Sequence, residues 1–502
     1  MSKDYDVIVI GAGMAGLTCA LSLSAEGKKV LVLEKQPVPG GVATSFKRKG
    51  FKFEASLHFV DALAGGEEVR EFLDKHGVSQ KIEFIELKEF GRVIYPEHDF
   101  IVGNDFESLK SWCKNNFPQE DKGIERFFAD MKKFSVEFDS FMDSKLPLLF
   151  KFIISPVFYR SIITTSCLTL EQFIEDRIKD KKLAAILGTI WGFTGLPPGE
   201  LSAFYFLIVL RGCWGAKTAF VKGGFNRLFE AIVERIREYG SEVRFNSSVK
   251  QIITDGGKRA QGVVTDKGEE IKGDAVISNA NCIDTLCRLI DSPALRDSYV
   301  KKLSPMQKSI SALTLYLGLD VPAKVVGMNN FLLSINTTYD HAQSYKNCLL
   351  SKYNLCGLAV VDHSQLDPGL APSGKSCICV MTLDSFSNWS GLSKQEYELK
   401  KKKAGDEVLG LLEKYLPGIS KHVEVMEVGT PLTMARFPSL PEGAVYGLAQ
   451  TVSQSGINRL DQLTKIKGLF LCGAWTRPGC GVHGCYVSGA EAAQFALKYL
   501  RR

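Results

Sequence analysis

Six residues near the N-terminus have the types and the spacing of a nucleotide-binding loop. Gly11, Gly13 and Gly16 match G-x-G-x-x-G, with Met14 and Ala15 between the last two glycines. Gly11 allows a tight turn, the missing side chain of Gly13 lets a pyrophosphate approach the backbone, and Gly16 lets a helix pack closely on a strand. The free N–H groups at the start of that helix would bind the phosphates.

An acidic residue and a second glycine pair follow this loop. Glu34 comes directly after an apolar run at residues 30–33, where its carboxylate can accept hydrogen bonds from both ribose hydroxyls. Beyond it, Gly40 and Gly41 form another stretch of backbone that can approach the same phosphates. Together the two glycine segments and the acid predict a bound dinucleotide.

The elements that must position these residues form a βαβ unit. Residues 7–10 are apolar and β-branched, which is typical of a central parallel strand. Residues 17–26 predict a helix that Gly27 ends, and residues 30–33 predict the next strand. Near the other end of the chain, a strand and glycine turn at residues 468–476 precede a helix that we expect from Ala490 to the end.

The string from the first strand to Gly40 and Gly41 resembles the N-terminal signature of flavoprotein oxidoreductases of the glutathione reductase and amine oxidase type. The resemblance implies an α/β fold, with a Rossmann-like FAD-binding domain and a mixed sheet-and-helix substrate domain. The implied cofactor is FAD. The resemblance places the following residues around it: Gly11, Gly13, Met14, Ala15, Gly16, Glu34, Lys35, Gly40, Gly41, Val42, Val249, Gly473, Gly481, Val482 and His483.

Over nearly its whole length the chain looks like the carotenoid and retinoid oxidoreductase family, which contains phytoene desaturases, carotenoid cis-trans isomerases and retinol saturases. The resemblance implies saturation, desaturation or isomerisation of carbon-carbon double bonds in a hydrophobic polyene, with an external electron donor or acceptor that the sequence does not identify. It rests on residues 50–54, 195–198, 222–224, 429–431 and 443–447, and on the glycine-rich C-terminal segment.

Some residues refine this resemblance and others depart from it. Leu57-His58-Phe59 resembles a retinol saturase position, which favours the saturase and isomerase side. Val42 stands where many members have arginine, so Lys35 would have to supply the missing basic contact. Phytoene desaturases tend to have a glycine pair where this chain has Cys480-Gly481.

No Ser-His-Asp, Cys-His or metal-ligand spacing is present in the sequence, so we expect no metal and assign the redox chemistry to the flavin. His58 and His483 are the candidate catalytic residues, as proton donors or charge-stabilising groups. For each of them, packing or a hydrogen bond to FAD is the alternative. We expect five aromatic side chains to line an apolar substrate pocket: Trp191, Phe193, Phe204, Trp214 and Phe220.

Other functions use the same scaffold. The chain could be a flavin amine oxidase, with Trp475 as one wall of an aromatic cage, or a polyunsaturated fatty-acid double-bond isomerase. A non-catalytic FAD-containing escort protein is a further alternative, which the glycine-rich C-terminal segment disfavours.

The order of the motifs predicts two interleaved domains. We expect a discontinuous FAD-binding domain and a substrate domain with a helical lid. Helices are predicted at residues 109–145 with a break at Pro118, and at 168–182, 203–210 and 393–415; strands at 311–319, 358–362, 376–383 and 423–428 should form an antiparallel sheet over the flavin. The FAD-binding domain comprises residues 1–75, 215–285 and 436–502, and the substrate domain residues 76–214 and 286–435.

Composition excludes several classes of protein. The chain is 45% hydrophobic and 24% charged, as globular proteins are, and a net charge of +6 spread over 502 residues does not indicate a nucleic-acid partner. Thirteen cysteines without C-x-x-C pairs, and no signal-peptide pattern or clean apolar span, predict a cytoplasmic protein. Residues 146–163 combine aromatic and aliphatic side chains with Lys151 and Arg160, which favours docking on a membrane surface over a lid packed on its own protein.

Overall fold

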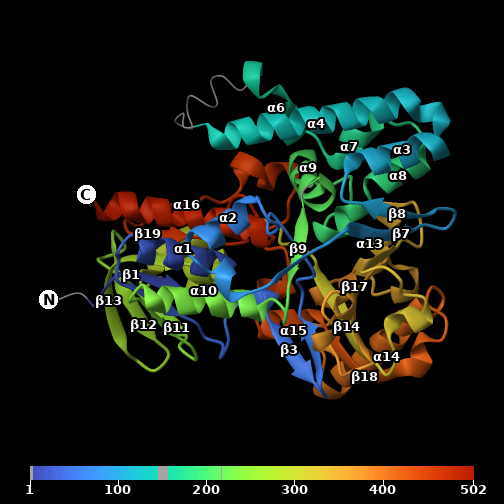
Figure 1. Cartoon of the computed structure of the whole chain (residues 1–502). Helices are drawn as coiled ribbons and strands as arrows, with labels where there is room; N and C mark the ends of the chain where they lie inside the picture. The colour runs from blue at the N-terminus through green and yellow to red at the C-terminus, as the bar shows by residue number, and fades with distance from the viewer. Residues whose placement is uncertain (1–3, 145–155, 216, 502) are drawn as a thin grey trace.

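The computed structural model describes residues 4–144, 156–215 and 217–501 (Figure 1). Two large sheets lie side by side, and a group of helices covers one side of the second sheet and of the region between them. The predicted α/β fold with a mixed sheet-and-helix part is confirmed. The domain boundaries given above stay a prediction.

The first sheet carries the glycine loop. Its order is β10-β2-β1-β13-β12-β11, with β19 paired in parallel to β13. Val7 and Val9 of β1 belong to one hydrophobic cluster, and Ile8 and Ile10 to another, so both faces of the strand are covered. The strands are β1 (Tyr5–Ile10), β2 (Val30–Leu33), β10 (Glu242–Arg244), β11 (Val249–Thr254), β12 (Ala260–Thr265), β13 (Glu270–Ser278) and β19 (Leu469–Leu471).

Three helices pack together beside this sheet: α1 (Met14–Ala25), α10 (Asn226–Glu238) and α16 (Val482–Leu500) (Figure 1). The last helix begins at Val482, eight residues before the predicted start at Ala490. Its glycines serve close packing rather than a loop, because a Cβ on Gly489 would lie 2.3 Å from the carbonyl oxygen of Ala15 in α1.

The second sheet has the order β18-β14-β17-β16-β15-β7-β8. All its pairs are antiparallel except β15 with β7. The four predicted strands are confirmed as β14, β16, β17 and β18. The strands are β7 (Glu89–Ile94), β8 (Asp99–Gly103), β14 (Ser311–Leu319), β15 (Leu332–Ile335), β16 (Leu358–Asp362), β17 (Ser376–Asp384) and β18 (Val423–Gly429).

Two small sheets connect the large ones. In one, β9 lies between β5 and β6, and in the other β3 and β4 form a hairpin. Because β5 packs on α16 and β4 packs on β17, the chain between Glu54 and Val60 runs from the second sheet to the first. The strands are β3 (Ser45–Arg48), β4 (Phe51–Glu54), β5 (Val60–Asp61), β6 (Phe84–Glu86) and β9 (Thr218–Val221).

The helices predicted at residues 109–145, 203–210 and 393–415 are confirmed. The break at Pro118 separates α3 from α4, α9 spans the predicted residues 203–210, and Ser393 with Glu396 forms a capping box at the start of α14. The helices are α2 (Glu68–Lys75), α3 (Phe106–Asn116), α4 (Asp121–Asp143), α6 (Arg160–Ser166), α7 (Leu170–Glu175), α8 (Lys181–Leu187), α9 (Ala203–Leu210), α11 (Cys282–Asp284), α12 (Pro293–Leu303), α13 (His341–Leu349), α14 (Lys394–Glu413) and α15 (Pro431–Arg436).

The prediction of a single helix at residues 168–182 is wrong. The helix divides into α7 and α8 because Asp180 caps a new start, and its carboxylate accepts hydrogen bonds from the backbone N–H of Lys182 and Leu183. The Glu120 side chain accepts hydrogen bonds from the N–H groups of Lys179 and Asp180, at 3.0 and 2.6 Å, which fixes the turn.

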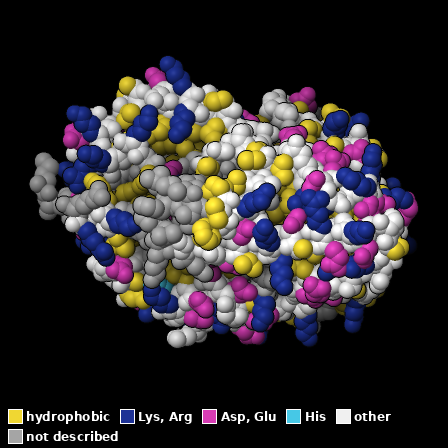
Figure 2. All heavy atoms as spheres, turned by 90° about the horizontal axis from the view of Figure 1, so that it is seen from above, with side chains coloured by type: hydrophobic (Ala, Val, Ile, Leu, Met, Phe, Trp, Pro, Cys, Tyr) yellow, Lys and Arg dark blue, Asp and Glu magenta, His cyan; other side chains and the backbone are white. Residues whose placement is uncertain are grey.

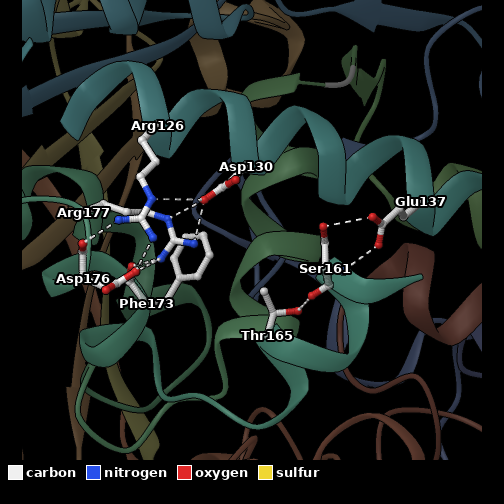
Figure 3. Close-up of polar contacts among 8 residues, drawn as sticks. All are labelled: Arg126, Asp130, Glu137, Ser161, Thr165, Phe173, Asp176 and Arg177. Atoms are coloured by element: carbon white, nitrogen blue, oxygen red, sulfur yellow. Dashed lines mark hydrogen bonds and ion pairs between the residues drawn. The ribbon is translucent and has the colours of Figure 1, made fainter. Parts of the chain in front are cut away.

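Side chains of α4 fasten the helices that lie against it (Figure 3). Arg177 donates to Asp130 Oδ2 at 2.9 Å and to the Phe173 carbonyl at 2.6 Å, and it lies over the Phe173 ring. Glu137 accepts hydrogen bonds from the backbone N–H and the hydroxyl of Ser161, at 2.7 and 3.0 Å. A carboxylate from α4 thus caps the start of α6.

Candidate active site

The glycine loop joins β1 to α1 and leaves no room for side chains. Gly11 has a φ of +95°, which favours glycine. A Cβ on Gly16 would lie 2.1 Å from the carbonyl oxygen of Gly11, and a Cβ on Gly13 would lie 2.8 Å from Asn279 Nδ2. Gly13 is also the N-cap of α1 and provides no side-chain cap, so the first N–H groups of the helix remain available to an anion.

Glu34 is buried at the carboxyl end of β2 with its carboxylate fixed in place. Oε2 accepts a hydrogen bond from the Ala12 N–H at 2.7 Å, and Oε1 accepts one from the Gln36 N–H at 2.8 Å. Two residues before Val249 begins β11, the N–H of Ser247 donates to the Glu34 carbonyl at 2.9 Å. The segment before β11 therefore lies at the same strand end as the carboxylate.

The second glycine pair lies beside the first loop. The N–H of Gly40 donates to the Ala12 carbonyl at 2.9 Å, and a Cβ on Gly41 would lie 3.5 Å from Gly13 Cα. Both residues have positive φ, at +115° and +61°. Two stretches of bare backbone therefore meet, as the approach of a pyrophosphate requires.

Lys35 and Val42 are the two positions that concern the basic contact to FAD, because Val42 stands where many relatives have an arginine. Lys35 donates from Nζ to the Ser439 hydroxyl. Burial lowers the pKa of Lys35, and the attraction of Glu34 opposes this shift. Val42 lies in a short 3-10 turn, where its carbonyl accepts a hydrogen bond from Ser56 Oγ at 2.7 Å. Val42 makes this contact with its backbone and not with its side chain.

The C-terminal segment returns to α1. Gly473 follows β19 with a φ of +103°, and a Cβ there would lie 3.8 Å from the Cβ of Ala15 and 2.6 Å from Asn279 Oδ1. Its N–H donates to Ser488 Oγ at 3.0 Å. Met14 and Ala15 are both buried at this junction, which joins the two ends of the chain.

Asn279 is a residue that the sequence analysis missed. It follows β13, its N–H donates to the Ile10 carbonyl at 2.8 Å, and its side chain lies within 4 Å of the Cβ positions of all four glycines: Gly11, Gly13, Gly16 and Gly473. A polar residue directly after a parallel strand was the available signal, because ligands bind at the carboxyl ends of such strands.

His58 lies between the two large sheets in contact with a second buried histidine. Its Nδ1 is 3.3 Å from His363 Nε2, and its Nε2 is 3.1 Å from Met381 Sδ in β17. Burial lowers the pKa of His58 to about 4, so the ring is neutral near pH 7.

One of the five predicted pocket residues, Phe220, contacts this pair, and two others, Phe193 and Trp214, belong to a group of rings around Phe59 and Phe90. Phe220 packs on His363, with ring centroids 5.6 Å apart. Phe59, next to His58, packs on Phe90 and Phe193 at 5.5 and 6.2 Å, and Phe90 packs on Trp214 at 6.2 Å. We call Phe59, Phe90, Phe193, Trp214 and Phe220 the aromatic cluster.

The other two predicted pocket residues lie in different surroundings. Trp191 donates from Nε1 to His341 Nδ1 at 2.8 Å and packs on Tyr345. Phe204 of α9 packs on Phe134 and Phe138 of α4.

His483 is engaged at both ring nitrogens. Nδ1 lies 3.2 Å from Asp61 Oδ2, and Nε2 lies 3.0 Å from Glu68 Oε2. Burial alone would lower the pKa of His483, but the hydrogen bonds and charges of Asp61 and Glu68 raise it to about 10. The imidazole is thus a bound cation whose two N–H groups are already used, which makes His58 the better candidate for proton transfer.

The residues present fit FAD. The two glycine segments and Gly473 form a cradle of bare backbone, Glu34 stands at the ribose position, and α16 begins at Gly481 and Val482 without a side-chain cap. These residues would hold the phosphates, the adenosine ribose and the flavin ring, respectively. When bound, FAD supplies hydride transfer to or from a carbon atom. Within residues 4–144, 156–215 and 217–501, no three His, Cys, Asp or Glu side chains are grouped as metal ligands.

Comparison with known proteins agrees with this geometry. The family of flavin containing amine oxidoreductases matches residues 14–497. The prolycopene isomerase of Daucus carota is 27% identical over 98% of this chain and 80% of its own length. A 4,4'-diapophytoene desaturase of Methylomonas is 27% identical over 98% and 95%, and the all-trans-retinol 13,14-reductase of Danio rerio is 26% identical over 94% and 82%.

Solved structures share the fold. An oxidoreductase from Methanosarcina mazei superposes with a TM-score of 0.65 at 18% identity, covering 97% of this chain and 100% of that one. The cyclohexylamine oxidase of Brevibacterium oxydans gives 0.63 at 17% identity, covering 99% and 100%. The chain therefore belongs to the family of flavin containing amine oxidoreductases, and it is an FAD-dependent oxidoreductase.

Proposed function

We propose that the protein acts on carbon-carbon double bonds of a hydrophobic polyene, such as a carotenoid, a retinoid or a related isoprenoid. The observation that carries this proposal is the aromatic cluster of five uncharged rings, in which Phe59 follows His58 in the chain and Phe220 packs on His363. Such a lining suits a long conjugated hydrocarbon, which offers no polar group for recognition. Relatives named for isomerisation, desaturation and reduction of such molecules support it.

The chain's own residues would bind and orient the substrate. The aromatic rings exclude water and fix one bond of the polyene, while His58 offers a neutral ring nitrogen to that bond. Because the cluster residues come from different elements, with Phe90 in β7, Phe220 in β9 and Phe59 next to β5, the aromatic cluster depends on the packing of the second large sheet and the small sheet of β5, β9 and β6.

Amine oxidation and fatty-acid isomerisation are the alternatives that the first experiment separates. The FAD-loaded protein, oxidised or photoreduced, is mixed in a stopped-flow instrument with lycopene in detergent micelles, an aliphatic amine or linoleic acid. The flavin absorbance reports electron transfer. We expect a rapid change only with the polyene; a change with the amine or the fatty acid alone would overturn the proposal.

A second experiment tests the aromatic cluster with a matched pair of variants. Phe193→Ala should lower kcat/KM for the polyene about tenfold, since it removes part of the substrate contact. Phe204→Ala removes the same side chain from the different group of rings on α4 and α9, and it should change kcat/KM less than threefold. Equal losses in the two variants would place the substrate elsewhere.

We also propose that the helices around α4 and α6 dock on a membrane surface. The side chains of Val157 and Phe158 are exposed, at 76% and 65%, and Arg160, two residues after Phe158, is exposed as well. Figure 2 shows hydrophobic side chains among Lys and Arg on the face seen from above. Apolar groups can enter the headgroup region while the cations bind anionic lipids. Most of the predicted docking segment, residues 146–155 of 146–163, lies outside the described residues.

This docking has its own test. No helix within the described residues is long and apolar enough to cross a bilayer. Sedimentation with vesicles containing phosphatidylserine should pull down the wild type, and replacing Val157 and Phe158 by Ser should weaken binding about tenfold. Val325→Ser, which removes an apolar side chain that is 60% exposed in another part of the chain, should bind as the wild type does. Equal binding by all three proteins would contradict docking at this site.

A further inference from the structure

Arg459 is a buried cation that holds the turn after β19. Its side chain is only 3% exposed. Nη2 donates to the Ala474 carbonyl at 2.6 Å, and Nε donates to the Thr476 carbonyl at 2.9 Å. Both residues come shortly after Gly473, whose bare backbone is part of the glycine cradle. One guanidinium therefore binds two carbonyls of the segment that leaves the cradle.

The same guanidinium joins a second segment to this turn. Nη1 donates to the Leu448 carbonyl at 3.2 Å. The residue before it, Gly447, packs directly on the turn, because a Cβ there would lie 3.0 Å from the Ala474 carbonyl oxygen. Within the turn, Thr476 Oγ1 donates to the Gly473 carbonyl at 2.9 Å. The fold alone therefore fixes the position of the guanidinium.

No carboxylate balances the charge of Arg459 within the described part of the chain. The hydrogen-bond partners of its side chain are all backbone carbonyls. Carbonyl dipoles stabilise a guanidinium but carry no net negative charge. Burial lowers the pKa of Arg459, yet an arginine side chain stays protonated. Because a buried charge without a counter-ion costs free energy, this turn is suited to an anionic ligand.

Two other basic side chains near the cradle already have partners. Lys35 donates to the Ser439 hydroxyl. Arg477 is in an ion pair with Asp461, so its charge is balanced within the protein. Arg459 differs from both, because it is buried and has no acidic partner among the described residues. Its charge is available to a ligand.

We propose that Arg459 is a cofactor-positioning residue whose charge balances the diphosphate of FAD. It acts through the turn: its N–H groups hold the carbonyls that follow Gly473, and the bare backbone of Gly473 is left to the phosphates. Arg459 thus replaces the basic contact that is missing at Val42 and that the sequence assigned to Lys35. The inference concerns FAD and not the substrate, so it does not depend on the function proposed above.

FAD and riboflavin, which lacks both phosphates, separate charge from shape. Arg459→Gln removes the charge, so the Kd for FAD should rise about 10- to 100-fold while the Kd for riboflavin changes less than about threefold. Flavin fluorescence titration of the apoprotein measures both constants. ADP and adenosine, as competitors of FAD, give the same comparison for the other half of the cofactor. Equal losses with and without phosphates would mean that Arg459 only shapes the turn, and would overturn the proposal.

Two further variants keep this comparison decisive. Arg459→Lys retains the charge with fewer hydrogen bonds, and it should keep the preference for FAD over riboflavin; a folded Arg459→Lys protein without this preference would contradict the charge. Arg477→Gln is the matched control, since it removes a nearby guanidinium that already has an acidic partner. It should bind both flavins as the wild type does.

The reduction potential of bound FAD separates the diphosphate from the reduced flavin ring, the other anion of the holoenzyme. The diphosphate has the same charge in both redox states. At saturating FAD, Arg459→Gln should therefore keep the ratio of oxidised to reduced flavin within about threefold of the wild type at any set potential. A tenfold loss of the reduced form, about 30 mV for two electrons, would assign the charge to the ring and refute the diphosphate role.

Discussion

Nδ1 of His483 lies 3.2 Å from the carboxylate of Asp61, a residue 422 positions earlier in the chain. Asp61 ends β5 and His483 is the second residue of α16, so the contact ties the start of the helix to the small sheet. A cation at a helix N-terminus is unfavourable by itself, and the carboxylates of Asp61 and Glu68 offset it. The end of α16 that would face the flavin is held by this contact.

His483 should make stability depend on pH in the alkaline range. Its folded-state pKa of about 10 lies above the unfolded value of about 6.5, so its contribution is complete below pH 6.5 and is lost as the pH rises through 10. We expect His483→Gln to cost about 1 to 2 kcal/mol at pH 6 and nearly nothing at pH 10.5, because the partly exposed carboxylates are screened. Urea unfolding at the two pH values measures this, and a cost that is equal at both would contradict the ion pair.

Glu54 should also make stability fall as the pH rises, but in a lower pH range. Burial raises its pKa from 4.5 to about 7, although Ser45, Lys52 and the Phe225 N–H favour the carboxylate. The folded state therefore holds a proton that the unfolded state has lost, and stability falls as the pH rises from about 4.5 to 7. Glu54→Gln should be more stable than the wild type by about 3 kcal/mol at pH 8 and equal to it at pH 4.5. The exposed Glu83, changed to Gln, serves as the control, and a Glu54→Gln protein that tracks the wild type at every pH would refute the shift.

Gly16 should tolerate no side chain. Its Cβ would lie 2.1 Å from the backbone oxygen of Gly11, so Gly16→Ala must move α1 away from β1 and should cost at least about 3 kcal/mol together with flavin binding. Gly410, in the last turn of α14, has open space around its Cβ position, and Gly410→Ala should stabilise the protein by up to about 1 kcal/mol. Thermal unfolding compares the two variants. Similar melting temperatures would mean that the loop is looser than described.

Glu34 should set the affinity for FAD. Glu34→Ala removes the acceptor of the Ala12 and Gln36 N–H groups as well as the expected ribose contact, and the Kd for FAD should rise about 10- to 100-fold. Flavin fluorescence titration of the apoprotein measures the Kd. Glu26→Ala, at an exposed position just after α1, should leave the Kd unchanged, and an equal effect of both variants would remove Glu34 from the site.

The sequence was most informative where function depends on neighbours along the chain. The glycine spacing, Glu34 and the strand at residues 311–319 were all predictable, because strands and helices impose short periods on apolar residues and a tight turn demands glycine. The prediction failed where a local pattern had two solutions. The pattern of residues 168–182 is compatible with one continuous helix, but the Asp180 N–H donates to Glu120 at a turn that interrupts it. The glycines before Ala490 indicated a loop, but Gly489 lies within α16 and packs against α1.

By itself, the sequence determined the βαβ unit and the kind of cofactor, since both are encoded in residues that lie within about forty positions of each other. Only the tertiary structure decided that Asn279 closes the glycine cradle, that His363 meets His58, and that His483 is bound by two carboxylates. These partners are hundreds of residues apart, and their contacts arise from the packing of two sheets. The periodicity of a single sequence does not indicate such packing. Burial constrains the polarity of a residue, but it does not identify the distant residue that this residue contacts.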